Sequence, residues 1–193
     1  MSGVDIAGPW LSYAIRSLPE AAFYEISSIS EIPTHLDDTF DCITFLETIE
    51  HLPRGTEPQA LSRLSALLRP TGTLILSTPA AGIAQFFDPA WFLVGHRHYR
   101  LKRLYELLEH AEMNVIDVRY WGGCRTMINI ILMYVWKHLF RHRYIPIGWM
   151  NRRLDSSLSS RRNLFSTNVW VFAQRKQESV DCVEGQPPRI RDH

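Results

Sequence analysis

The chain has 193 residues, of which 46% are hydrophobic and 21% charged, values typical of one globular domain with its own core. Its net charge of +1 gives no overall signal for a nucleic-acid partner, and we expect none. Three widely spaced cysteines exclude a disulfide framework, and the absence of a signal peptide pattern predicts a cytoplasmic protein.

Apolar periodicity predicts alternating strands and helices in the first part of the chain. Residues 2–6 are predicted to be the end of a strand, residues 11–18 a helix that Pro19 ends, and residues 22–26 a short strand. Residues 40–46 are apolar on both faces, which is typical of a central parallel strand buried beneath helices.

The same alternation continues towards the carboxyl end. Residues 58–68 and 101–110 each place leucines on one helical face, and residues 73–77, 115–120 and 168–174 read as strands. The order of elements predicts an α/β fold with a mostly parallel sheet and helices on both faces.

A basic insert interrupts this pattern at about residues 125–165, within a single domain that we expect to span residues 1–176. An apolar stretch with arginines after it could form a helix that contacts an anionic membrane through residues 126–143. It could instead be a buried core helix followed by a solvated basic loop, which the length of the apolar stretch favours. Residues 177–193 are polar and are predicted to be a disordered tail.

Asp5 is the first candidate for a functional residue, because it ends its strand. Ligands of open parallel sheets bind beyond the carboxyl ends of the strands, where a carboxylate can accept two hydrogen bonds from a ribose diol. Acids at such positions also serve as helix caps or plain surface groups, so both interpretations stay open.

A second candidate cluster, Glu47-Thr48-Ile49-Glu50-His51, follows the strand at residues 40–46. Two carboxylates and an imidazole could bind a hard cation, with His96 or His98 as a further ligand. They could instead supply a general base for a substrate hydroxyl, with His51 near neutral pKa. A third interpretation is structural, with Glu50 orienting His51 in a helix-entry turn.

Residues 3–118 resemble class I S-adenosylmethionine (SAM) methyltransferases of the type 11, type 12 and ubiquinone-biosynthesis O-methyltransferase kind. The resemblance rests on four motifs in order. They are Gly3-Val4-Asp5-Ile6, Glu47-Thr48-Ile49-Glu50-His51, Leu68-Arg69-Pro70-Thr71-Gly72 and Ser77-Thr78-Pro79. It implies a Rossmann-like sheet and SAM as the cofactor.

The resemblance also implies roles for single residues. Asp5 matches the acid that holds the SAM ribose, and Ser28 stands where the family has an acid beside the adenine, so the backbone around Ile29 would share that contact. Glu47 matches a residue at the methionine end of SAM. These four form the predicted cofactor-binding set, and Glu50 with His51 forms the predicted catalytic pair.

Some related enzymes with a Glu-x-x-Glu-His motif and a later histidine bind a divalent cation, and the small-RNA 2′-O-methyltransferases are similar in this respect. The equivalent metal ligands here would be Glu47, Glu50, His51 and His98.

The chain departs from the family at its start. The family's first strand and glycine-rich turn should precede Asp5, where only Met1–Val4 stand, so we expect an N-terminally truncated fold with the first strand missing. That strand lies in the middle of the family's sheet, and its loss exposes apolar edges. We expect a replacement: direct pairing of the neighbouring strands, an oligomer that completes the sheet, or residues missing from the sequence.

The resemblance implies a SAM-dependent methyltransferase that acts on a small-molecule or lipid-like acceptor, with oxygen as the methylated atom. The alternative is a non-catalytic remnant or partner subunit that does not bind SAM alone. A nucleotide-binding oxidoreductase is a weaker third hypothesis, because the dinucleotide glycine fingerprint is lacking. The basic insert adds the hypothesis of peripheral membrane attachment.

Overall fold

The computed structural model describes residues 1–5, 8–140, 159 and 164–176. The strands are β1 Ser2–Asp5, β2 Ala22–Glu25, β3 Phe40–Leu46, β4 Leu68–Pro79, β5 Met113–Trp121 and β6 Asn168–Arg175. The helices are α1 Pro9–Ser17, α2 Glu57–Leu67, α3 Pro89–Val94, α4 Leu101–His110 and α5 Cys124–Phe140. Short 3-10 turns are η1 Ile29–Glu31, η2 Thr34–Leu36, η3 Ile49–His51 and η4 Ile83–Phe87. The predicted disordered tail and much of the basic insert lie outside the described residues.

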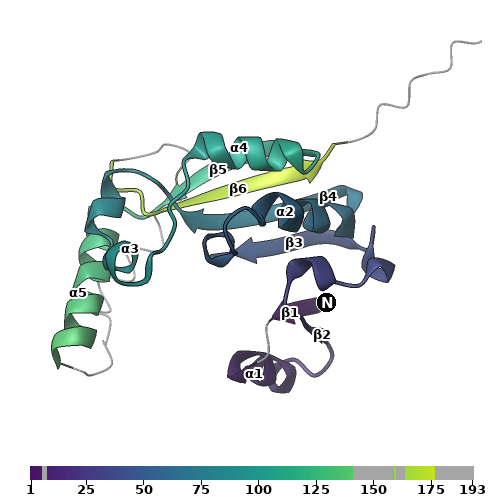
Figure 1. The fold of residues 1–193 in the computed structure, drawn as a ribbon, viewed down its shortest axis with the longest axis horizontal. Coiled ribbons are helices and arrows are strands. Elements are labelled where there is room, and N and C mark those ends of the chain that lie inside the picture. Colours follow the sequence, from purple (N-terminus) through teal and green to yellow (C-terminus); the bar gives the residue numbers. More distant parts are fainter. Residues whose placement is uncertain (6–7, 141–158, 160–163, 177–193) are drawn as a thin grey trace, which may run out of the picture.

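Every strand and helix expected from periodicity is present, and the described strands form two sheets (Figure 1). One sheet has the order β3-β4-β6-β5, and the other pairs β1 with β2. The β1–β2 and β3–β4 pairs are parallel, whereas β6 is antiparallel to both of its neighbours. Trp121 at the end of β5 pairs with Asn168 at the start of β6, so β6 must run back along β5.

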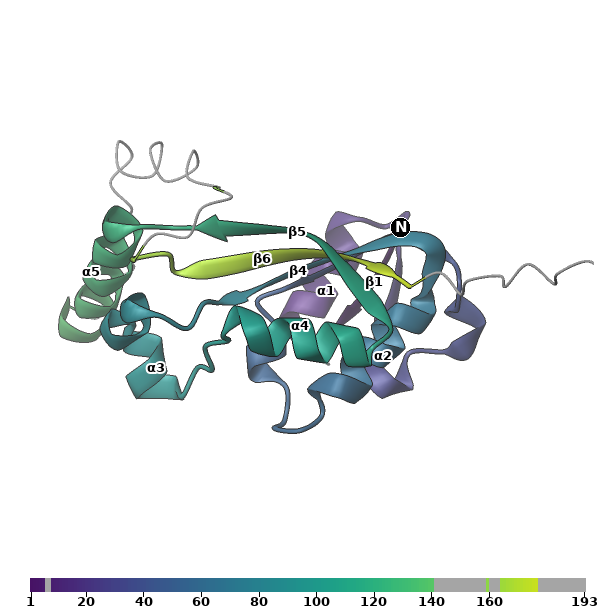
Figure 2. The ribbon, with the colours of Figure 1, turned by 90° about the horizontal axis from the view of Figure 1, so that it is seen from above.

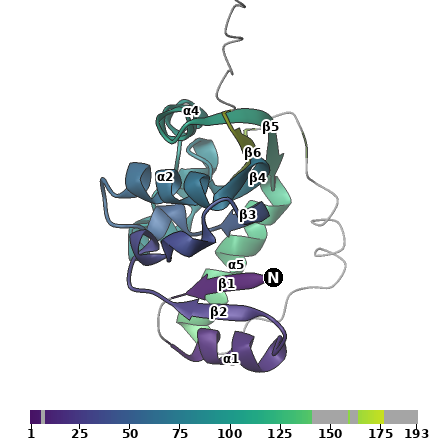
Figure 3. The same cartoon turned by 90° about the vertical axis from the view of Figure 1, so that its right-hand side faces the viewer.

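A gap separates the two sheets, because β1 and β3 lie next to each other but are not hydrogen-bonded (Figure 3). Phe45 is the one buried residue of β3. The prediction that residues 40–46 form a strand buried on both faces is therefore wrong. β3 is hydrogen-bonded to β4 alone, so its other edge and the side chains beside it face the gap and stay accessible. Direct pairing of β1 with β3, one of the three expected replacements, does not occur.

The core lies between the four-stranded sheet and helices α2 and α4, which cover one face of it (Figure 2). Leu61 and Leu64 of α2 and Leu104 and Leu108 of α4 are buried, each at the helical spacing that predicted this face. Burying each leucine contributes roughly 1.5–3 kcal/mol, so this layer fixes the strands whose ends form the site.

Helix α5 lies at one end of the molecule together with η4 and α3 (Figure 1). Met127 on its inner side is buried, whereas Ile128, Leu132 and Val135 are exposed. These three residues follow one another at spacings of four and three and so share one outer face of the helix. Among the helices that the structure describes, none is long and apolar enough to cross a membrane.

Candidate functional site

A cavity of about 420 Å³ lies in the gap between β1 and β3 and is here named the sheet-gap cavity. Its floor comes from the facing strands and from α2, and its rim comes from the turn that follows β2. The lining residues are Val4, Asp5, Ile26, Ser27, Ser28, Ile29, Ser30, Ile32, Ile43, Thr44, Phe45, Thr48, Leu52, Pro53, Thr56, Gln59, Ala60 and Leu64.

Three of the four residues predicted to bind the cofactor meet in the sheet-gap cavity: Asp5, Ser28 and Ile29. Local bonds set their positions. The Asp5 carbonyl oxygen accepts a hydrogen bond from the Ile26 amide at 3.0 Å, which ties the end of β1 to the end of β2. Ser28 caps η1 through its hydroxyl, which accepts from the Ser30 amide at 3.4 Å.

The sheet-gap cavity combines apolar walls with a few polar groups. Ile26, Ile43 and Phe45 offer apolar contacts, and Asp5 and Ser28 supply a carboxylate and a hydroxyl. Cavities for ligands of nucleoside size typically have volumes of roughly 300–1,000 Å³ and this kind of lining. The donor and acceptor set therefore fits a ligand with a planar ring and a vicinal diol.

The fourth residue of that set, Glu47, does not line the sheet-gap cavity. Its backbone adopts the left-handed conformation, with φ of 48°, which is uncommon for a residue other than glycine. Its amide donates to the Ser77 carbonyl at 3.0 Å, and its carboxylate accepts from the Ser77 hydroxyl at 2.6 Å and from the Asn168 amide group at 2.9 Å. The ends of β4 and β6 thus hold Glu47 in place, with its side chain directed away from the gap.

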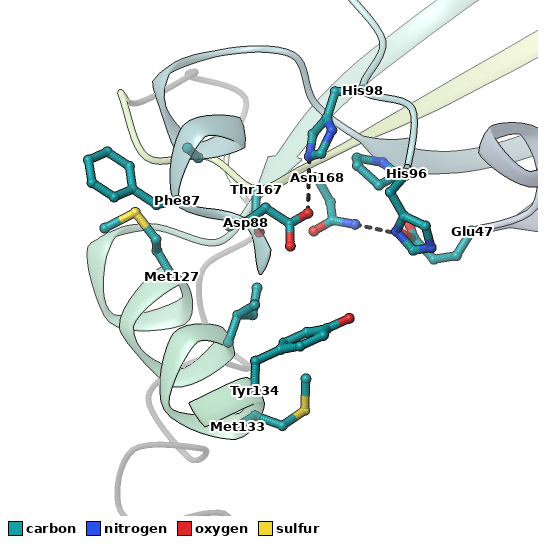
Figure 4. Close-up of a pocket in the computed structure, with 13 residues that line it drawn as sticks. Glu47, Phe87, Asp88, His96, His98, Met127, Met133, Tyr134, Thr167 and Asn168 are labelled. Carbon is teal, nitrogen blue, oxygen red and sulfur yellow. Dashed lines mark hydrogen bonds and ion pairs between the residues drawn. The ribbon is translucent and has the colours of Figure 1, made fainter. Parts of the chain in front are cut away.

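Glu47 lines a second cavity of about 200 Å³, the α5 cavity, between the sheet edge and α5. Polar and apolar groups lie on opposite sides of it (Figure 4). Glu47, Asp88, His96, His98, Thr167 and Asn168 supply the polar side, and Phe87, Met127, Ile130, Met133 and Tyr134 supply most of the apolar side.

The His98 ring contacts the Asp88 carboxylate at the edge of the α5 cavity, with His98 Nε2 3.2 Å from Asp88 Oδ2 (Figure 4). The His98 side chain is 5% exposed, and its Nδ1 is buried without a hydrogen-bond partner among the described residues. A buried N–H without an acceptor costs more than an unused lone pair, so the proton belongs on Nε2, facing Asp88. His98 therefore fixes the orientation of the Asp88 carboxylate.

Glu50, one of the two predicted catalytic residues, lines neither cavity. It is 5% exposed, and its Oε2 accepts from the Thr78 hydroxyl at 3.0 Å, whereas Oε1 has no partner among the described residues. Burial, reinforced by the charge of Glu47, raises the pKa of Glu50 to about 7. The Glu50 carboxyl is thus buried in the protein interior, where it affects neighbouring side chains and does not contact a molecule in either cavity.

His51, the other predicted catalytic residue, lies in a neighbouring recess with its ring 4.6 Å from that of His96. His96 lines both this recess and the α5 cavity. Burial and the nearby His51 lower the pKa of His96, which favours a neutral imidazole that can accept a proton. Of the two histidines, His96 is therefore the one in direct reach of a molecule in the α5 cavity.

Arg97 holds the turn that carries Glu50 and His51. Its Nε donates to the Glu50 carbonyl at 3.0 Å, and its Nη2 donates to the carbonyls of Ile49, at 2.9 Å, and Leu52. Its Nη1 forms an ion pair with Glu57. Burial opposes ionisation of Glu57, but amide hydrogen bonds and the Arg97 charge outweigh it and lower the pKa of that carboxyl.

The predicted cation ligands Glu47, Glu50, His51 and His98 do not come together. Within the described ranges, no three acidic, histidine or cysteine side chains are placed so that they could hold a metal ion. Glu47 is bonded to Ser77 and Asn168, and His98 is paired with Asp88. The prediction of a metal site is corrected accordingly, because spacing along the chain did not reveal these competing partners.

Sequence reasoning missed Asp88, Asn168 and Arg97 as site residues. Asn168 lies 121 residues from its partner Glu47, and no local pattern indicates that contact. Arg97 lies between His96 and His98, and the density of charge at residues 96–100 in front of a helix was the available signal for it; Asp88 stands eight residues before His96.

A family model described as a methyltransferase domain matches residues 7–118. A ubiquinone biosynthesis O-methyltransferase from Xanthomonas campestris pv. campestris is 39% identical over 56 residues, which are 28% of this chain and 22% of that protein. The aligned part thus spans about a fifth of the relative's length.

Two solved structures show the same fold. A Burkholderia thailandensis 1,6-didemethyltoxoflavin-N1-methyltransferase with bound S-adenosylhomocysteine has a TM-score of 0.53 and 16% identity, and the match covers 91% of this chain and 61% of that one. A Haemonchus contortus phospholethanolamine N-methyltransferase 2, also with S-adenosylhomocysteine, has a TM-score of 0.58 and 14% identity over 91% of this chain and 43% of that one.

Proposed function

The chain belongs to the methyltransferase-domain family, and on that basis we propose that it is a SAM-dependent methyltransferase with its cofactor in the sheet-gap cavity. The observation that carries the proposal is the meeting of Asp5 with Ser28 and Ile29 at the carboxyl ends of β1 and β2. SAM, when bound, supplies an electrophilic methyl group on a sulfonium centre.

The roles of the lining residues follow from their chemistry. The Asp5 carboxylate would accept hydrogen bonds from the ribose diol, and Ser28 and Ile29 would lie beside the adenine. Thr48 lines the sheet-gap cavity while its neighbour Glu47 lines the α5 cavity, so the two cavities lie on either side of this turn. The methionine end of SAM would lie near this turn.

The methyl acceptor would occupy the α5 cavity. Its apolar wall from α5 suits a small or lipid-like molecule, and the neutral His96 is a group that can accept the proton of a hydroxyl. The Xanthomonas relative is an O-methyltransferase by name, which agrees with oxygen as the methylated atom. His51 contacts His96 and would position it rather than act on the acceptor itself.

Calorimetric titration of the 193-residue chain with SAM tests the proposal. We expect saturable heat, and a rise in melting temperature on adding the cofactor, because a ligand that binds the native state alone stabilises it. Neither heat nor a thermal shift at millimolar SAM would reject cofactor binding by this chain.

The gap between β1 and β3 favours a second function, that of a partner subunit. Unpaired edges of this kind can accept a strand, so we propose that a further copy or another polypeptide completes the sheet. A strand in this gap would take space that the first proposal assigns to SAM, so the two proposals are alternatives. A chain that serves as a partner subunit should give no heat with SAM and should form an oligomer, or bind a partner, by light scattering.

We further propose that α5 attaches the protein to the surface of an anionic membrane. The support is its exposed apolar face, formed by Ile128, Leu132 and Val135, in a region of the sequence with an excess of arginine. Replacing Ile128 and Leu132 by glutamine should lower binding to phosphatidylglycerol vesicles more than tenfold, because each buried aliphatic side chain contributes roughly 1.5–3 kcal/mol. Flotation of the protein with vesicles measures this.

The matched control replaces two exposed apolar residues elsewhere, Leu18 and Ile116, by glutamine. This variant should float as the wild type does. Equal flotation of all three proteins would show that the outer face of α5 does not contact the membrane.

A further inference from the structure

A groove of about 580 Å³ runs beside the α5 cavity, and we name it the arginine groove. Four arginines line it: Arg54 before α2, Arg97 in the loop after α3, and Arg100 and Arg103 at the start of α4. Neither the cofactor nor the acceptor of the proposed reaction uses this groove, so the inference below goes beyond methyl transfer.

The charges in the arginine groove are not balanced by the described residues. Glu57 is the single acid in the lining that the structure describes, and Arg97 already pairs with it. Arg103 forms an ion pair with Glu106 at 3.3 Å, but this pair is exposed to solvent and therefore weak. Arg54 and Arg100 are exposed and have no carboxylate partner in the described part of the chain.

Four of the six arginines elsewhere in the described structure are paired with an acid, and the other two, Arg16 and Arg125, line neither the arginine groove nor the two cavities. Arg63, Arg69, Arg119 and Arg175 each meet an aspartate at 2.5–2.7 Å. The contrast matters because the chain as a whole has a net charge of only +1. Gathering unpaired guanidinium groups around one hollow is unfavourable by mutual repulsion, and an anion in the hollow removes that cost.

The groove also has an aromatic wall. Trp91 lines it, and its ring is held edge-on by Phe86 at 5.5 Å and Phe92 at 4.7 Å between ring centroids. The Trp91 indole lies next to guanidinium groups, and this pair suits a ligand that has an anionic oxygen group and a flat part that can stack on the indole.

We propose that the arginine groove binds a phosphate group, with Arg54 and Arg100 as its main contacts. Guanidinium groups bind phosphate oxygens in bidentate fashion, and two unpaired arginines offer two such forks. The phosphate can belong to a soluble phosphate ester or to a lipid headgroup. Because the groove shares His96 and His98 with the α5 cavity, a phosphate held here would lie next to the proposed acceptor.

The test is calorimetric titration of the full chain with inorganic pyrophosphate, together with flotation on phosphatidylcholine vesicles with and without phosphatidic acid. The double variant Arg54→Gln/Arg100→Gln should bind the preferred probe at least about tenfold more weakly than the wild type. Its melting temperature should not fall, because neither side chain has an ion-pair partner in the described structure to lose and their mutual repulsion is removed.

The matched control, Arg16→Gln/Arg69→Gln, removes the same charge at exposed sites outside the groove and should bind within about twofold of the wild type. Pyrophosphate binding that the double variant loses would identify a soluble phosphate as the source. Retention on phosphatidic acid vesicles that the double variant loses and that Ile128→Gln/Leu132→Gln keeps would identify a headgroup, since the outer face of α5 is proposed to bind anionic vesicles as well. No binding of either probe by the wild type would overturn the proposal. An equal loss in the control would also overturn it, since general charge attraction would then explain the binding.

Discussion

Replacing Arg97 by alanine is expected to lower the free energy of unfolding by about 3–5 kcal/mol, the usual cost of breaking a buried ion pair. The Arg97 and Glu57 side chains are only 18% and 9% exposed. The change would leave the Glu57 carboxylate without its cation and the Glu50 and Leu52 carbonyls without their Arg97 donor, while the Ile49 carbonyl would keep the Tyr99 hydroxyl. Urea unfolding followed by circular dichroism measures the loss.

Arg69→Ala is the matched control, because Arg69 also pairs with an aspartate, at 2.6 Å, but across a surface where the two side chains are 49% and 78% exposed. It should cost no more than about 1 kcal/mol. If Arg97→Ala unfolded at the same urea concentration as Arg69→Ala, the turn that carries Glu50 and His51 would not depend on Arg97.

Asp5→Asn is expected to weaken SAM binding by roughly 10- to 100-fold, which corresponds to the loss of about 1.5–3 kcal/mol from hydrogen bonds to a charged acceptor. The amide keeps the size of the carboxylate, so the shape of the sheet-gap cavity is preserved. Calorimetric titration with SAM measures the change in affinity.

Asp41→Asn serves as the control, since Asp41 is an exposed acid of β3 that does not line the sheet-gap cavity. It should bind SAM as the wild type does. Equal weakening in both variants would indicate a general effect of charge, and no weakening in Asp5→Asn would remove Asp5 from the cofactor site.

The order of strands and helices could be predicted from the sequence because an element with one buried face has apolar residues at a regular spacing. This spacing is visible within a short stretch of sequence. Leu104 and Leu108 show this in α4, and the β3 bounds at residues 40–46 were predicted without error. The surroundings of β3 could not be predicted in the same way. Burial of β3 depends on whether a second strand pairs with its free edge, and the apolar residues of β3 do not reveal this.

In the candidate site, too, some contacts could be predicted from the sequence and others could not. The meeting of Asp5, Ser28 and Ile29 agrees with the resemblance that suggested it, since parallel strands bring their carboxyl ends to one edge. The roles of Glu47 and His98 depend on Asn168 and Asp88, which are distant in sequence. Such contacts follow from tertiary packing, so motif spacing alone pointed to a metal site that the described residues do not form.

The central claim is that the sheet-gap cavity holds SAM, and hydrogen exchange of the chain with and without S-adenosylhomocysteine tests it most directly. We predict slower amide exchange at residues 26–30 and 43–48, on the two sides of the cavity, and little change at residues 95–103 of the arginine groove. Unchanged exchange at residues 26–30 and 43–48 with saturating ligand, or protection confined to residues 95–103, would contradict the claim.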